Sequence, residues 1–104
     1  MATPELTDEQ RAAALVKATA VRSARRVFKE ELAQGKMSLQ EAITRAKADE
    51  ALAGIRVRDL LQCLPGIGPK RAESAMEEIG ISPARRIRGL GAHQVEALVE
   101  REHR

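Results

Sequence analysis

The sequence predicts an all-α fold, with a long N-terminal helix followed by a small helical domain. The 104-residue chain has the length of one domain. Ala, Arg, Glu and Leu, which favour helix, are its commonest residues. Phe28 is the only aromatic residue, so a sheet with a buried face would lack the side chains it needs. We expect a basic amphipathic helix over residues 1–36 and a helical domain over residues 37–104, joined in one globular unit.

The first helix is expected to begin after Thr7. Thr7 and Gln10 have the spacing of a capping box, in which each side chain bonds the backbone N–H of the other residue. Asp8 and Glu9 in the first turn suit the positive end of the helix dipole. The helical pattern continues to residue 32 or 33, and Gly35 is the expected C-terminal cap.

Two sides of this helix differ in character. At 100° per residue, Val16, Ala20, Ala24, Val27 and Phe28 fall on one apolar side. A basic ridge, spaced i, i+3, i+4 and i+7 and extended by Arg11, lies on another side and consists of Arg22, Arg25, Arg26 and Lys29. Two interpretations of the ridge stay open: it follows the phosphates of a nucleic acid, or it is a solvated face that pairs with the acids of another chain.

Shorter helices are expected over the middle of the chain. Ser38 and Glu41 form a second capping box for a helix that runs to about residue 49. Its inward positions are Leu39, Ala42, Ile43 and Ala46. Gly54 follows the break, and a third short helix is expected over residues 57–63. Cys63 is the only cysteine, which excludes an internal disulfide and favours a small core side chain.

The last helices are bounded by glycine and proline. Pro69 suits the first position of a helix, because its missing N–H is not needed there, and Gly80 caps the end of that helix. Ser82 and Pro83 repeat the start signal for a short turn of helix, and residues 88–91 predict a tight turn. A final helix is expected over residues 92–102, with its inward positions at Val95, Leu98 and Val99.

The most informative segment is the glycine hairpin, Gly66-Ile67-Gly68. Glycines allow a sharp turn and the close approach of another backbone. The hairpin leads directly into a helix N-terminus, whose free N–H groups attract an anion such as phosphate. Lys70 and Arg71 add positive charge at the same place, while Ile67 is expected to point inward. The alternative interpretation is a plain tight turn between packed helices, which a Gly-x-Gly pattern alone does not exclude.

A second turn, the arginine turn at residues 85–88, carries three arginines in four positions around Ile87. The planar guanidinium group can bond two phosphate oxygens at once. The hairpin, the segment 79–83 (Ile-Gly-Ile-Ser-Pro) and the arginine turn together resemble the helix-two-turns-helix motif of formamidopyrimidine-type DNA glycosylases and of a small-subunit ribosomal protein. The resemblance implies that the arginine turn is a second backbone contact beside the hairpin, with Ile87 in the core.

The resemblance extends over nearly the whole chain. Residues 6–15 (Leu-Thr-Asp-Glu-Gln-Arg-Ala-Ala-Ala-Leu), the leucines before the hairpin, and residues 85–91 (Arg-Arg-Ile-Arg-Gly-Leu-Gly) together resemble the actinobacterial integration host factor family. This resemblance implies a nucleoid-associated helix-two-turns-helix protein that binds duplex DNA, bends or compacts it, and assists site-specific recombination and transcription. The DNA contacts that it implies are Gly66, Gly68, Lys70, Arg71, Arg85, Arg86, Arg88, Arg22, Arg25, Arg26 and Lys29.

The chain departs from the pattern of that family in three places. Arg58 replaces a serine near the start of the third helix, so we expect the N-cap there to be lost. Pro69 replaces a lysine after the hairpin, which moves the charge to Lys70. Residues 101–104 replace a Phe-Gly pair near the C-terminus. These changes concern the detailed phosphate contacts and not the class of protein.

An enzyme is the first alternative, because DNA glycosylases contain the same motif. Pro4 is similar to the proline nucleophile of one glycosylase class, but it does not stand at the N-terminus. No carboxylate pair, nucleophile–base pair or metal cluster stands out, and we expect His93 and His103 to be surface residues. The sequence therefore predicts no catalytic residue, no metal and no cofactor.

Two binding alternatives also stay open. A phosphate-binding hairpin does not by itself distinguish DNA from RNA, although the lack of stacking aromatics argues against reading single-stranded bases. Alternatively, the chain is an interaction module for an acidic protein, in which case Arg85→Ala would not weaken DNA binding. We expect a cytoplasmic protein of the nucleoid, monomeric in solution, with no membrane contact. Its expected partners are double-stranded DNA, gripped at two separate basic surfaces, and a recombinase.

Overall fold

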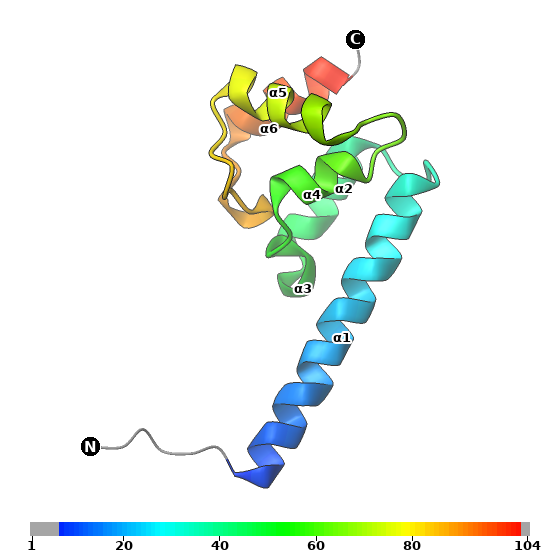
Figure 1. The fold of residues 1–104 in the computed structure, drawn as a ribbon, viewed down its shortest axis with the longest axis vertical. Coiled ribbons are helices and arrows are strands. Elements are labelled where there is room, and N and C mark those ends of the chain that lie inside the picture. Colours follow the sequence, from blue (N-terminus) through cyan, green and yellow to red (C-terminus); the bar gives the residue numbers. More distant parts are fainter. Residues whose placement is uncertain (1–6, 103–104) are drawn as a thin grey trace, which may run out of the picture.

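One long helix, α1 (Asp8–Ala33), leads into a cluster of short helices that lies beside its C-terminal half only (Figure 1). The computed structural model describes residues 7–102, so Pro4, Leu6 and His103 lie outside the described range. The elements that follow are α2 (Leu39–Lys47), α3 (Glu50–Ala53), α4 (Val57–Gln62), α5 (Pro69–Ile79), the 3₁₀ turn η1 (Ile87–Gly89) and α6 (Ala92–Glu102). The predicted all-α fold, a long helix followed by a helical domain, is confirmed.

Both ends of α1 follow local signals in the sequence. The backbone N–H of Gln10 donates to Thr7 Oγ1 over 3.1 Å, and the N–H of Thr7 donates to Gln10 Oε1 over 2.9 Å. These two bonds complete the predicted capping box. Just after the helix, Gly35 has a φ of 72°, which glycine adopts without strain. The predicted start, end and glycine cap of α1 are therefore confirmed.

The apolar side predicted for α1 is buried only in part. Phe28 and Leu32 are buried, whereas 71% of Val16 and 43% of Val27 are exposed. Residues 8–20 are exposed throughout, because the domain does not reach that far along the helix. Phe28 faces the core and its neighbour Val27 does not, since successive side chains are rotated by about 100°. The docking position of the domain, and not the apolar pattern alone, decides which side of α1 is buried.

The hydrophobic core lies where the end of α1 meets α2, α4, α5 and α6. Its largest fully buried side chains come from α1, α2, α4, η1 and α6: Phe28, Leu32, Ile43, Val57, Leu60, Leu61, Ile87 and Leu98. The predicted inward face of α2 is buried, while Val95 and Val99 in α6 are only half-buried beside Leu98. Burying each large aliphatic side chain contributes about 1.5–3 kcal/mol, so these residues hold the helices together.

The short helix α3 was not expected. The second helix was predicted to continue to about residue 49, but α2 ends at Lys47. Asp49 has an extended backbone, and its Oδ1 accepts the N–H of Ala51 over 2.9 Å. Aspartate competes for backbone N–H groups in this way, which favours a new N-cap over continuation of the helix. Asp49 therefore starts a separate helix that packs against α1.

Gly80 ends α5 as predicted, with a φ of 83°. The N–H of Ile81 donates to Met76 O over 2.8 Å and the N–H of Gly80 to Glu77 O over 3.2 Å, the pattern of a Schellman cap. A turn starts at Ser82 as predicted, but it is not helical. The N–H of Arg85 donates to Ser82 O over 2.9 Å, which closes a single turn, and the chain then becomes extended.

An antiparallel bridge joins this extended segment to the chain before α4. The N–H of Val57 donates to Arg85 O and the N–H of Ile87 donates to Ile55 O, each over 2.9 Å. Arg56 and Arg86 are the bridged pair. Arg56 is also the N-cap of α4, and its side chain makes no capping hydrogen bond. Arg58 therefore lies inside the helix and not at the N-cap, where we expected it.

Candidate nucleic-acid interface

The glycine hairpin forms as predicted, but its two glycines serve different purposes. Gly66 has a φ of 82°, a left-handed conformation that favours glycine. Gly68 has an extended backbone with a φ of −93° and is the N-cap of α5. A Cβ added to Gly68 would meet nothing within 4 Å, so the space in front of the helix is open. Ile67 is 8% exposed and anchors the hairpin in the core.

The start of α5 offers two backbone donors beside two cations. The first N–H inside the helix that bonds back along the chain is that of Ala72, to Gly68 O over 3.1 Å. The N–H groups of Lys70 and Arg71 come before it and remain available to an anion. Arg71 Nη2 lies 3.4 Å from Glu102 Oε2, so this side chain is partly neutralised by α6. Lys70 is exposed.

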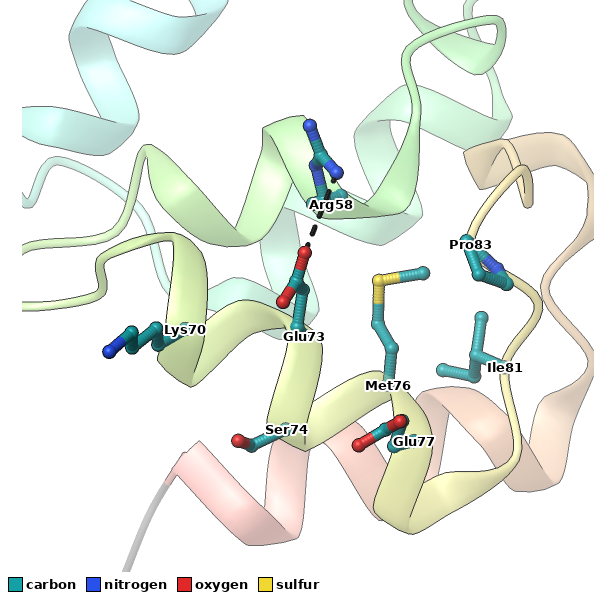
Figure 2. Close-up of a pocket in the computed structure, with 8 residues that line it drawn as sticks. All are labelled: Arg58, Lys70, Glu73, Ser74, Met76, Glu77, Ile81 and Pro83. Carbon is teal, nitrogen blue, oxygen red and sulfur yellow. Dashed lines mark ion pairs between the residues drawn. The ribbon is translucent and has the colours of Figure 1, made fainter.

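A pocket of about 470 Å³ lies between α4, α5 and the segment 81–83. Figure 2 shows its lining, with the side chains of Arg58 and Glu73 pointing toward one another and Lys70 extended away from them. Arg58 Nη1 lies 3.8 Å from Glu73 Oε1, and both side chains are about half exposed or more. Met76 and Ile81 are buried beneath them. This mixed and open lining places Arg58 on the same face of the domain as Lys70.

The arginine turn holds its side chains outward around one buried residue. Ile87 is fully buried, as predicted, while Arg86 and Arg88 are exposed. Arg85 Nη1 donates to Gly89 O over 3.0 Å, within the turn itself. Arg86 Nη1 donates to Gly54 O over 2.5 Å, which ties the turn to the end of α3. The turn is therefore fixed by its own arginines and by the bridge to Ile55 and Val57.

The basic ridge of α1 borders an open groove of about 560 Å³ that it shares with the end of α4. All four ridge residues line this groove: Arg22, Arg25, Arg26 and Lys29. Cys63 lines its other side, half-buried, with Sγ donating to Asp59 O over 3.1 Å. Burial raises the pKa of the Cys63 thiol even though Lys29 lies nearby, so the thiol stays neutral near physiological pH. The groove is therefore lined by four cations and an uncharged thiol, together with Glu30 and Ala33.

The ridge and the arginine turn meet at Gly54. Arg25 Nη2 and Arg88 Nη2 lie 2.7 Å and 3.7 Å from the point that a Cβ on Gly54 would occupy. Arg86 bonds the carbonyl oxygen of the same glycine. We call Arg25, Arg86 and Arg88 the Gly54 arginine cluster. Two surfaces that the sequence suggested to be separate are thus joined, because α3 packs against both α1 and η1.

The expectation that the arginine turn lies beside the glycine hairpin is wrong. The hairpin precedes α5 and the turn follows it, so the two lie at opposite ends of this helix (Figure 1). A straight helix of 11 residues separates its ends by about 16 Å. Adjacent positions in the motif do not imply adjacent positions in space, because α5 is a rigid spacer between them.

Two cationic residues near the site were not among the predicted contacts. Arg56 and Arg58 are exposed, whereas Ile55 before them and Val57 between them are buried. This alternation of apolar and basic residues over 55–58 is the signal that would have found them. The chain is extended at Arg56 and enters α4 at Val57. The bridge from Arg56 to Arg86 brings Arg56 to the arginine turn.

Two absences apply to residues 7–102. Within that range no helix is long and apolar enough to cross a membrane. Nor do the same residues gather three or more His, Cys, Asp or Glu side chains that would hold a metal ion.

Comparison with known proteins gives the family. Residues 32–102 match the S13-like H2TH domain, in which H2TH stands for helix-two-turns-helix. The chain is 48% identical over 101 residues to the integration host factor of Mycolicibacterium smegmatis, covering 97% of this chain and 96% of that protein. It is 47% identical over 102 residues to the integration host factor of Streptomyces coelicolor, covering 98% and 94%.

A solved structure is also similar. It is described as sIHF bound to an 8-bp palindromic DNA, and it aligns with a TM-score of 0.78 and 42% identity over 83% of this chain and 96% of that one. The relatives matched over nearly their whole length carry the name of an integration host factor and not of an enzyme. Sequence, fold and structural similarity agree, and this chain belongs to the actinobacterial integration host factor family, with an S13-like H2TH domain.

Proposed function

We propose that this protein binds double-stranded DNA through the phosphate backbone. The observation that supports the proposal is the gathering of guanidinium groups from α1 and the arginine turn around Gly54. Like charges held this close repel one another unless an anion lies among them. A similar solved protein is described as bound to DNA, which supports a duplex as the source of that anion.

In this mechanism the cluster and the hairpin are two contacts on one rigid body. Arginine forks bond phosphate oxygens without reading bases, so these contacts position the protein and specify little sequence. With few contacts to base edges, sequence preference comes through DNA shape and deformability.

The finer role follows from the same arrangement. The projecting half of α1 carries Arg11 away from the domain, which extends the contact along DNA. Residues 1–36 then act as the basic arm and residues 37–104 as the H2TH domain. A monomer with these contacts bends or compacts DNA, assists site-specific recombination beside a recombinase and influences transcription. Its place in the cell is the nucleoid, in the cytoplasm.

Fluorescence anisotropy with a labelled duplex across a salt series tests the proposal. With roughly five phosphates neutralised, the logarithm of the binding constant should fall with the logarithm of salt concentration with a slope of about −4 to −5. Replacing Arg85, Arg86 and Arg88 together with alanine should abolish most binding while the helical circular dichroism stays. Arg45→Gln on α2, whose charge pairs with Glu31, is the matched control and should bind nearly as the wild type.

Two results would contradict the proposal. A folded triple variant that binds as tightly as the wild type would make the arginines a surface cluster, and a protein partner would replace DNA as the leading interpretation. Equal competition by duplex RNA would favour the alternative of an RNA-binding protein, because the same phosphate contacts serve both polymers.

A further inference from the structure

We propose that Gly54 is a positioning residue of the interface, where the missing side chain leaves the space in which Arg25 of α1 joins Arg86 and Arg88. The inference rests on the proposed DNA binding and names a residue that makes no phosphate contact of its own. Gly54 is buried at the end of α3, the short helix that lies between the ridge and the arginine turn.

Space, and not backbone conformation, is the reason for glycine at this position. The φ of Gly54 is −82°, which every residue adopts easily. A Cβ on Gly54 would lie 2.7 Å from Arg25 Nη2, closer than real Cβ contacts. The glycine therefore makes room for the guanidinium group of Arg25.

The end of α3 holds the arginines in place. Arg25 Nε donates to Ala51 O over 2.8 Å, and Arg86 Nη1 donates to Gly54 O. Carbonyl groups in the last turn of a helix have no partner within it, so these bonds satisfy them. Each guanidinium has five N–H donors, and one used here leaves the others for phosphate oxygens. A side chain that is already ordered loses less entropy on binding DNA.

The charge arrangement points to an anion at the same place. Arg88 Nη2 lies 3.7 Å from the same Cβ position, so guanidinium groups from two distant segments converge on it. Within residues 7–102, no carboxylate forms an ion pair with Arg25, Arg86 or Arg88. Backbone carbonyls thus order Arg25 and Arg86, and none of the three cations has a neutralising side chain within residues 7–102, as expected of groups that bind an external phosphate.

The substitution Gly54→Ala tests the inference without dismantling the core. The atom that the new methyl group meets is the far end of a flexible side chain, so Arg25 moves and the fold stays. Gly91→Ala is the matched control, because its Cβ would make only an ordinary 3.8 Å contact with Gln94 Oε1. Thermal unfolding of both variants, followed by circular dichroism, should remain close to that of the wild type.

A double-mutant cycle on duplex DNA supplies the decisive measurement. We expect Arg25→Ala to weaken binding about tenfold and Gly54→Ala to weaken it by most of that factor. The double variant should bind like Arg25→Ala alone, because the glycine acts only through that arginine. Each of the three variants should show a salt slope reduced by about one, the loss of one phosphate contact. A purely structural role of Gly54 would not change the slope in this way.

A second pair of variants keeps the positive charge but replaces the guanidinium group. Arg25→Lys cannot make the Nε–H bond to Ala51 O. Arg26→Lys alters a neighbour on the same ridge whose side chain has no hydrogen bond to residues 7–102. We expect Arg25→Lys to weaken binding several times more than Arg26→Lys. This comparison also decides the matter if Gly54→Ala does not fold.

The outcomes separate the inference from the proposed function. Wild-type protein that binds no duplex would overturn both. Wild-type binding with independent, multiplicative effects of Gly54→Ala and Arg25→Ala would overturn the inference alone. So would equal effects of the two lysine substitutions.

Discussion

The two halves of α1 belong to one unbroken helix but differ in almost everything else. The N-terminal half, residues 8–20, is exposed on every side and projects from the molecule (Figure 1). The C-terminal half buries Phe28 and Leu32 and holds Arg25 against α3. Helix propensity is sufficient to continue a helix once it is formed, but only tertiary contacts give a segment stability and a defined side-chain geometry.

The same contrast distinguishes two kinds of cation. Arg11 stands on the projecting half of the helix, where its exposed side chain attracts DNA mainly through charge. Arg25 lies less than four turns further along the same helix. Its side chain bonds a backbone carbonyl and occupies the space beside Gly54. Charge alone predicts equal contributions from these residues, whereas the packing predicts that the ordered arginine contributes more.

The largest expected effect comes from breaking the packed half. Phe28→Ala removes the only aromatic side chain, which is 1% exposed, and should destabilise the fold by about 3–5 kcal/mol. Val16→Ala, in the projecting half, should change the free energy of unfolding by less than about 0.5 kcal/mol. Chemical denaturation measures both. Similar losses for the two variants would show that the projecting half is packed in solution, contrary to the structure.

A smaller effect is expected when one arginine is removed from each half. Arg25→Ala should weaken duplex binding about tenfold, or about 1.4 kcal/mol, and Arg11→Ala by a clearly smaller factor. The reason is that only Arg25 belongs to the Gly54 arginine cluster. Anisotropy titrations at one salt concentration make the comparison. Equal losses would mean that the ridge acts only through its charge.

Removal of the N-cap should act on the projecting half alone. Thr7→Ala loses the capping box and costs that helix end about 1 kcal/mol. Because residues 8–20 are exposed throughout, the loss should appear as local fraying and leave the global unfolding transition nearly unchanged. Amide hydrogen exchange of the first turns is the measurement. A large drop in the global melting temperature would contradict the separation of the two halves.

The smallest effect concerns pH and the packed half. Burial raises the pKa of Cys63 above its ordinary value of 9.0, so the folded state keeps this proton when the unfolded state loses it. The stabilisation is fully present at lower pH and is lost as pH rises beyond about 9, where the unfolded thiol ionises. The free energy of unfolding should therefore decline more steeply above that pH in the wild type than in Cys63→Ala. Parallel declines would contradict the assigned cause.

Local signals in the sequence accounted for most of the helix boundaries. Thr7, Pro69 and Gly80 start or end helices where the sequence predicted, because a cap depends on residues only a few positions apart. The N-cap at Asp49 was not predicted, because aspartate is tolerated within a helix as well as at its N-cap. The arginines and lysines predicted as DNA contacts are exposed or half-buried on α1, at the start of α5 and in the arginine turn, whereas Arg56 and Arg58, exposed cations nearby, were not among the predicted residues.

The sequence by itself determined which residues are cationic, where most of the helices begin and end, and that a glycine turn leads into the helix that starts at Pro69. Only the tertiary structure decided that Val16 is exposed, that α5 separates the hairpin from the arginine turn, and that Arg25 meets Arg88 at Gly54. The physical reason is the separation along the chain of the residues that interact. Caps and turns are stabilised by hydrogen bonds between near neighbours, but the meeting of α1, α3 and η1 follows from burying one shared core, to which the whole chain contributes.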